Sequence, residues 1–215
     1  MTHFSRTRVA PLTVSLGIGA LIGLAGPITE KWDNPVCVSL NVVLSDGWAW
    51  VCYAFLVGYC ARSKARAALL SSLGLAIGVV AYYVFKDLSP TSSAGLESGA
   101  TGEVNYSSML AWGVAAFALG APVGILGNLA IIPSLGGLSF RLIVPFVAIF
   151  ETSMQLTAEA EGQRAVVGIT WNVIRFIAGA VAMALVLHAI WSWRHSRRTC
   201  SAELERRARS GVSPL

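Results

Sequence analysis

Charged residues are scarce in this chain, and their scarcity limits the class of protein it can be. Only 13% of the 215 residues are charged, whereas 55% are hydrophobic, and the mean hydropathy is +0.65. Soluble domains carry about 25% charged residues. A soluble protein of this composition would expose large apolar patches and aggregate. The composition therefore argues against a soluble domain and favours a protein dissolved in lipid.

Motifs for catalysis and metal binding are also missing. The chain has no GK[ST], HExxH or GxSxG motif, and its four cysteines form no CxxC or Cys/His ligand spacing. The run Gly17–Gly23 lacks dinucleotide-binding spacing and a preceding strand. Residues 137–140 with His188 match intramembrane serine proteases only in part, because Phe140 stands where a glycine is expected after Ser139. We therefore expect no enzyme activity, catalytic residue, metal or cofactor.

Six long apolar stretches are what the chain does contain. They lie at about 9–27, 48–61, 67–85, 107–127, 140–158 and 165–193. Only helices and closed barrels satisfy their backbone groups inside lipid, and barrel strands alternate where these stretches are continuously apolar. The first stretch exceeds the 7–15 residues of a signal-peptide core, so we expect a retained helix. The prediction is an all-α polytopic membrane bundle of six transmembrane helices over residues 1–198, with a poorly ordered tail at 199–215.

The distribution of basic residues predicts how the bundle is threaded. With the N-terminus inside, 12 of the 16 basic residues fall in cytoplasmic segments, which set the orientation by the positive-inside rule. They are Arg6, Arg8, Arg62, Lys64, Arg66, Arg141, Arg194, Arg197, Arg198, Arg206, Arg207 and Arg209. Both termini are then cytoplasmic. Because topology already accounts for these residues, the net charge of +5 does not indicate nucleic-acid binding.

Two external segments follow from this threading. Residues 36–44 are apolar but too short to cross about 30 Å of hydrocarbon, so we expect a short helix on or dipping into the outer surface. Ser45 or Asp46 is expected to cap the next helix. Residues 87–106, rich in Ser, Thr, Gly and Glu, are expected to form a flexible external loop.

Small residues recur every four positions in two of the predicted helices. Ser15, Gly19 and Gly23 lie on one face of the first helix, and Gly74 and Gly78 lie on the third. Such faces let helix backbones approach closely. We favour packing inside this chain's own bundle, and a membrane protein partner docked on the first helix is the alternative.

The segment 120–139 holds the clearest helix-breaking signal. Pro122 and several glycines interrupt the fourth apolar stretch, and Pro133 follows. A broken helix at membrane depth lines a cavity or is buried in protein, so Asn128 is a candidate ligand-binding residue. A simple kink followed by an interfacial loop is an equal alternative.

Glu151 is the one acidic residue inside an apolar stretch. Ionisable residues at membrane depth mark a functional-site hypothesis. Gln155 lies one turn further on the same face. Near the outer end of the last helix, Trp171, Asn172 and Arg175 add polar groups. We predict that Glu151 faces the bundle and joins Gln155 and at least one of Asn172 and Arg175. A register-fixing ion pair and a polar cavity both remain open, and Glu159 is a competing partner for Arg175.

Part of the chain resembles a known group of proteins. The run Ser45-Asp46-Gly47-Trp48-Ala49-Trp50 through Phe55–Gly58, then Arg62 and Tyr82-Tyr83, is similar to a family of small bacterial multi-pass membrane proteins known only as a domain of unknown function. That resemblance covers the second and third helices and implies a bacterial inner membrane but no activity. In architecture alone, six helices in about 200 residues resemble the substrate-binding subunits of energy-coupling-factor vitamin transporters.

These observations lead to two expectations of function. The first is a small-molecule binding or transport subunit of the inner membrane, with an outward-facing pocket for a small polar ligand between the external ends of helices four to six. Its ligand-binding residues would include Glu151, Gln155, Trp171, Asn172 and Arg175, with Asn128. The second is a non-enzymatic interaction or assembly protein, in which the polar residues only hold the helices in register.

Overall fold

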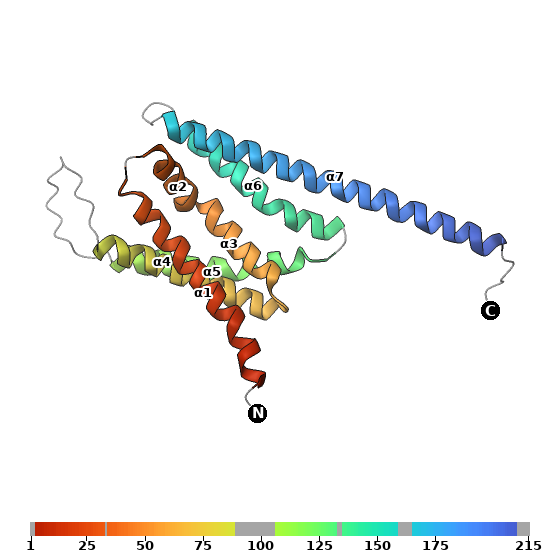
Figure 1. Ribbon diagram of the computed structural model, residues 1–215, viewed down its shortest axis with the longest axis horizontal. Coiled ribbons are helices and arrows are strands. Elements are labelled where there is room, and N and C mark those ends of the chain that lie inside the picture. Colours follow the sequence, from red (N-terminus) through yellow and green to blue (C-terminus); the bar gives the residue numbers. More distant parts are fainter. Residues whose placement is uncertain (1–2, 33, 89–105, 133–134, 159–164, 210–215) are drawn as a thin grey trace.

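The computed structural model describes residues 3–32, 34–88, 106–132, 135–158 and 165–209, and this part of the chain is all helical. Seven helices appear in it (Figure 1): α1 (His3–Thr29), α2 (Pro35–Ser45), α3 (Gly47–Cys60), α4 (Lys64–Leu88), α5 (Tyr106–Leu129), α6 (Leu135–Ala158) and α7 (Ala165–Arg209). The predicted external loop at 87–106 falls mostly outside the described residues.

Five of the described helices are long and apolar enough to cross a membrane: α1, α4, α5, α6 and α7. The remaining predicted span, at 48–61, corresponds to α3, which has 14 residues and meets α2 at a bend of 60°. The two short helices count together as one broken span or as a re-entrant loop. The expected short helix at 36–44 is thus α2, and it is joined directly to α3.

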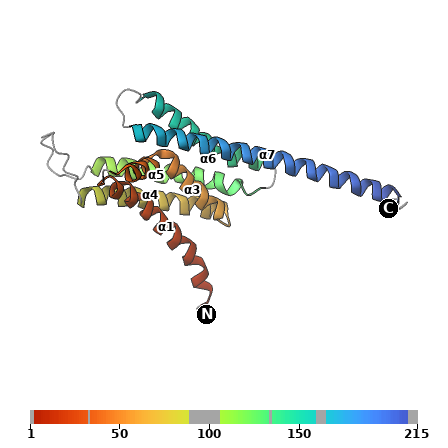
Figure 2. The ribbon, with the colours of Figure 1, turned by 45° about the horizontal axis from the view of Figure 1, so that its top comes forward.

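The helices form two groups joined by the broken pair. Helix α4 packs against α1, α3 and α5, and α3 also packs against α5. Helices α6 and α7 run antiparallel as a separate pair, which Figure 2 shows apart from the four-helix group. The pair meets the rest of the bundle chiefly where α2 contacts α7 and α3 contacts α6. The bend between α2 and α3 therefore lies at the junction of the two groups.

Small residues hold α1 against α4. A Cβ at Gly19 would overlap the carbonyl oxygen of Gly74, and a Cβ at Gly23 would overlap that of Gly78. Ser15, one turn earlier, donates to the Leu70 carbonyl at 3.2 Å. The small-residue faces predicted on two separate helices therefore meet each other, because only glycine lets these backbones come so close.

A second glycine contact joins α3, α4 and α5. A Cβ at Gly58 would overlap the backbone of Gly124, and a Cβ at Gly127 would overlap the Phe55 carbonyl. Ser71 Oγ donates to the Ala54 carbonyl at 2.8 Å, which ties α4 to α3. Helix α5 therefore uses its glycines for packing and continues through Pro122 as far as Leu129. The break considered near Pro122 is not present, and the broken span lies at Asp46.

The helix α7 is longer than the sequence analysis predicted. It remains helical to Arg209, eleven residues beyond the expected boundary at 198, so the expected poorly ordered tail is helical over 199–209. The stretch from Ser201 to Arg209 contains no Gly or Pro and consists mainly of Ala, Leu, Glu and Arg, which are strong helix formers. Its glutamates also stand four residues before arginines, a spacing that supports a helix. Residues 210–215 lie outside the described part.

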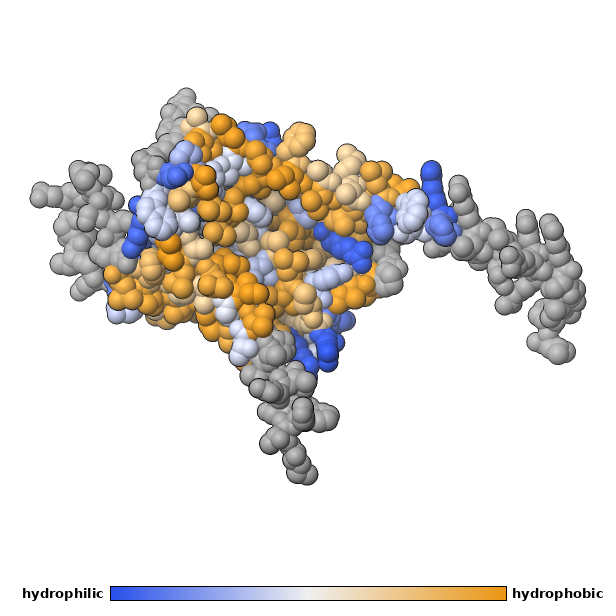
Figure 3. All heavy atoms as spheres, in the orientation of Figure 1, coloured by the Kyte–Doolittle hydropathy of each residue, from blue (hydrophilic) through white to orange (hydrophobic). Residues whose placement is uncertain are grey.

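Hydrophobic residues face outward over most of the described surface. On the face seen in Figure 3 they cover most of the described helices, while hydrophilic residues gather in a few small groups. Phe176 is 82% exposed and Leu21 is 67% exposed. Apolar exposure on this scale is expected where lipid is the solvent, and it agrees with the coarse prediction of a helical membrane protein.

Candidate functional site

The site begins at the bend between α2 and α3. Asn34 caps the start of α2 by accepting a hydrogen bond from the Val36 amide at 3.0 Å, and Pro35 occupies the first helical position. Asp46 stands at the N-cap of α3, but its side chain makes no cap hydrogen bond. Its Oδ2 instead accepts from Trp171 Nε1 at 3.1 Å. The expectation that Ser45 or Asp46 would cap this helix through its side chain is therefore wrong, because Asp46 is turned toward α7.

Glu151 of α6 takes over the capping of α3. Its Oε1 accepts a hydrogen bond from the Gly47 amide at 2.7 Å, across 104 residues of sequence. The first amides of a helix have no partner within it and carry a partial positive charge. A carboxylate at this place supplies a hydrogen-bond acceptor for the amide and a negative charge opposite the positive helix end. Glu151 therefore faces α3 and the bundle, as the sequence analysis predicted for this residue.

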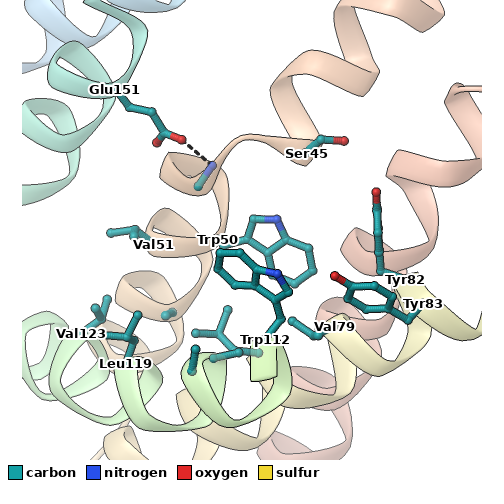
Figure 4. A pocket seen from close by; sticks show the side chains of 15 residues that line it. Ser45, Trp50, Val51, Val79, Tyr82, Tyr83, Trp112, Leu119, Val123 and Glu151 are labelled. Carbon is teal, nitrogen blue, oxygen red and sulfur yellow. Dashed lines mark hydrogen bonds between the residues drawn. The ribbon is translucent and has the colours of Figure 1, made fainter. Parts of the chain in front are cut away.

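A cavity of about 490 Å³ opens beside this carboxylate. Its wall comes mainly from α3, α4 and α5, with Ser45 contributed by α2 and Glu151 by α6 (Figure 4). Four aromatic side chains surround it: Trp50, Tyr82, Tyr83 and Trp112. Among the described residues Glu151 is the only charged one of the lining, and most of the remaining wall is apolar. Figure 4 shows Glu151 on one side of the cavity and the two tyrosines on the other.

One carboxylate oxygen of Glu151 is left available. Oε1 is bonded to Gly47, and within the described part of the chain Oε2 has no hydrogen-bond partner. A carboxylate accepts hydrogen bonds at both oxygens. Glu151 can therefore hold α3 with one oxygen and accept a hydrogen bond from a ligand with the other.

One aromatic residue of the cavity, Tyr82, already makes a cation–π contact within the protein. The Lys86 ammonium lies 5.7 Å from the centroid of the Tyr82 ring, and Tyr82 meets Tyr83 in an edge-to-face contact at 5.4 Å. A distance within about 6 Å is that of a cation–π contact. Lys86 itself does not line the cavity. Trp50, Trp112 and Tyr83 thus remain as the aromatic residues for which no such contact is seen.

The polar residues predicted on α7 are not joined to Glu151. Among the described residues Glu151 forms no hydrogen bond or ion pair with Asn172 or Arg175. Arg175 donates to Asn172 Oδ1 at 3.0 Å, and both side chains are exposed. Glu159, the competing partner, lies outside the described residues. The prediction that Glu151 bonds with at least one of Asn172 and Arg175 needs this correction.

The orientation of α7 explains the difference. Trp171, Ile174 and Ala178 form its buried stripe and pack with Ala148 of α6. Asn172 and Arg175 lie beside this stripe rather than on it. Trp171 reaches the site indirectly, through its hydrogen bond to Asp46. Gln155, half-buried one turn after Glu151, forms no hydrogen bond with it and does not line the cavity.

Asn128, the remaining predicted ligand-binding residue, lies at the opposite end of α3. Its Nδ2 donates to the Ala61 carbonyl at 2.7 Å and to the Gly58 carbonyl at 3.5 Å. Ala61 is the C-cap residue of α3, and the Gly58 carbonyl also accepts from the Ala61 amide at 3.1 Å. The structure therefore places Asn128 as a cap for the end of α3, away from the cavity.

The aromatic residues of the cavity were not predicted as site residues. In the sequence, Trp50, Tyr82 and Tyr83 contributed only to the family resemblance. The signal that was available is that all three, with Trp112, fall near the predicted outer ends of their helices. Within the described residues, no group of three or more His, Cys, Asp and Glu side chains could hold a metal ion.

Comparisons with known proteins add no family or function: no family model, curated protein or solved structure matches this chain.

Proposed function

We propose that this chain is a membrane binding or transport subunit that takes up a small organic ammonium ion in the cavity beside Glu151. In this proposal it crosses the inner membrane six times, with α2 and α3 as one broken span and both termini in the cytoplasm. The observation that carries the proposal is the Glu151 carboxylate, which among the described residues is the single charge in a cavity whose other lining side chains are mainly aromatic and apolar.

Charge complementarity selects the ligand class. The described lining contains one carboxylate and no Lys, Arg or His, so a cation is favoured and an anion is disfavoured. In a site of low dielectric a single unpaired carboxylate attracts a cation more strongly than it would in water. The free oxygen Oε2 offers a hydrogen-bond acceptor for an ammonium N–H.

The aromatic side chains favour an organic cation over a metal ion. The faces of Trp and Tyr attract ammonium groups, and cages of such rings bind alkylated ammonium ligands. A metal ion would require several oxygen, nitrogen or sulfur ligands, and the cavity offers one carboxylate with few other polar groups. The apolar part of the wall, which includes Val79, Leu119 and Val123, suits a hydrocarbon portion of the ligand.

The position of the cavity supports access from outside the cell. Its lining runs from Gly47 to Ala54 in α3, from Tyr83 back to Leu75 in α4 and from Trp112 to Val123 in α5. With the N-terminus in the cytoplasm, the cavity extends from the outer part of these helices toward their middle. A ligand would thus enter from the external face or from the outer leaflet.

A matched pair of probes tests the ligand class. Phenyltrimethylammonium and tert-butylbenzene have nearly the same shape, and only the first is charged. We expect phenyltrimethylammonium, which has no N–H and therefore tests the charge alone, to bind the protein in lipid nanodiscs, measured by quenching of tryptophan fluorescence, and to bind about tenfold more weakly to Glu151→Gln. Gln keeps an acceptor for the Gly47 amide, so α3 should stay capped. Glu30→Gln, which removes an exposed glutamate away from the cavity, is the control and should bind as the wild type does.

The outcomes separate the site from its ligand class. If both probes bind equally well and both lose affinity in Trp112→Ala, the cavity binds small molecules but does not select cations. No binding of either probe would reject both. If Glu151→Gln and Glu30→Gln lower the affinity equally, the effect belongs to the overall charge and not to this site.

The alternative, an interaction or assembly protein, has one observation in its favour. Asn172 and Arg175 are bonded to each other on an exposed face of α7, next to the strongly exposed Phe176. Charged residues in membrane segments usually face protein or water, so a neighbouring helix carrying an acidic residue would suit this face. A photo-crosslinking residue at Asn172 should then capture one defined protein, whereas the same residue at Leu187 should not. Capture of lipid alone at both positions would leave Arg175 as an anchor at the outer headgroups.

A further inference from the structure

A second hollow lies at the other end of the same helices, and it is independent of the proposed cation site. It has a volume of about 510 Å³ and runs between α1, α3 and α4. Its walls are mainly apolar and include Val14 and Ile18 of α1, Leu56 and Val57 of α3, and Leu70 of α4. Two charged residues line it, Arg62 and Arg66.

The two arginines are available for a ligand. Both side chains are exposed, and no hydrogen bond or ion pair of either guanidinium is found in the described residues. Among the described residues no acidic side chain lines the groove, so its mouth carries the positive charges of both arginines. Arginine binds phosphate groups through paired N–H donors.

The groove also has the dimensions of a lipid site. From Tyr53 to Ala61 its wall follows α3 for about 12 Å at about 1.5 Å per residue. One leaflet contributes roughly 15 Å of hydrocarbon, half of the core. The arginines stand in and just after the turn between α3 and α4, where the positive-inside rule predicts the cytoplasmic headgroup layer. An acyl chain lying along the apolar wall would therefore bring its phosphate to the level of the arginines.

We infer that this groove binds an anionic phospholipid of the cytoplasmic leaflet, with its headgroup phosphate on Arg62 and Arg66 and one acyl chain between α1, α3 and α4. Charge selects the anionic headgroup, because that leaflet carries anionic lipids and the groove carries only positive charge. The apolar walls add a contact for an acyl chain to the charge of the two arginines.

Native mass spectrometry tests the inference on the full-length protein in detergent. The protein is equilibrated with equal amounts of phosphatidylglycerol and phosphatidylcholine that carry the same acyl chains. We expect the first bound lipid to be phosphatidylglycerol, with a preference of roughly tenfold, and the preference to disappear in Arg62→Gln/Arg66→Gln. Arg194→Gln/Arg197→Gln removes the same charge from α7 and should keep the preference.

A second variant and a competitor test the acyl-chain part. Val14→Trp fills the groove without changing its charge, and it should reduce retention of phosphatidylglycerol while leaving α1 helical by circular dichroism. Glycerol phosphate, the headgroup without its chains, should fail to displace the lipid. The inference is overturned if both arginine pairs lose the preference equally, if Val14→Trp retains the lipid fully, or if glycerol phosphate displaces it at comparable concentration.

Discussion

The amide of Gly47 donates to the Glu151 carboxylate at 2.7 Å, so a side chain of α6 caps a helix whose own N-cap residue, Asp46, is engaged elsewhere. At the other end of α3, Asn128 of α5 donates to the Ala61 carbonyl at 2.7 Å. Both ends of this 14-residue helix are thus held by side chains of other helices. A helix this short has few internal hydrogen bonds, so the caps contribute to its stability.

Removing the Glu151 cap should destabilise the protein, and keeping an acceptor there should not. Glu151→Ala leaves the Gly47 amide without a partner, and we expect a loss of about 1–2 kcal/mol in the free energy of unfolding. Glu151→Gln should lose less than half of that, because its amide oxygen can still accept. Thermal unfolding in nanodiscs, followed by circular dichroism, measures both. Equal Tm values for Ala, Gln and the wild type would show that the carboxylate does not support α3.

The Asn128 cap should behave in the same way at the other end. Asn128→Ala leaves the Ala61 carbonyl unpaired, with an expected loss of about 1 kcal/mol. Asn128→Asp should be as harmful, because a carboxylate can only accept and would face the carbonyl end of the helix. Both variants should nevertheless bind phenyltrimethylammonium normally, since Asn128 lies away from the cavity. If a folded Asn128→Ala protein does not bind the probe, Asn128 belongs to the ligand-binding site after all.

The glycines between α1 and α4 should not tolerate even one methyl group. A Cβ at Gly19 or Gly23 would overlap backbone atoms of Gly74 or Gly78, so Gly19→Ala/Gly23→Ala should separate the helices. The expected loss is about 1–3 kcal/mol per site. Gly17→Ala is the matched control, because a Cβ there meets nothing within 4 Å, and it should stabilise α1 slightly. A double variant as stable as Gly17→Ala would mean that α1 and α4 do not approach this closely.

The apolar helices themselves could be read from the sequence, whereas their rotation could not. Composition and length are enough to find α1, α4, α5, α6 and α7, since each needs only a long apolar run with few charges. Rotation about the helix axis normally follows from a contrast between apolar and polar faces, and helices such as α7 are apolar all round through their span. Asn172 and Arg175 were therefore assigned to the inner face when Trp171, Ile174 and Ala178 occupy it.

The candidate site could be predicted only at Glu151. A carboxylate in an apolar run is conspicuous, and its inward direction follows from the cost of exposing it to lipid. Its partner is a backbone amide 104 residues away. That amide is left without a partner in its own helix by the bend at Asp46, and no Pro or Gly directly precedes Asp46 to announce the bend. The cavity depends on how three helices meet, and that meeting is set by glycine contacts such as Gly58 with Gly124. Pairings of this kind are tertiary, and spacing within one helix does not reveal them.

The threading of the chain gives the last prediction. Twelve of the 16 basic residues fall inside when both termini are cytoplasmic, and this requires an even number of crossings. The five long helices supply an odd number, so α2 and α3 must together cross the membrane once. A reporter that is active only outside the cytoplasm should therefore be inactive when fused after Leu215 and active when inserted after Leu88. An inactive reporter at both places would mean that α4 does not carry the chain outward. Activity after Leu215 would instead make the α2–α3 pair a re-entrant loop and leave five crossings.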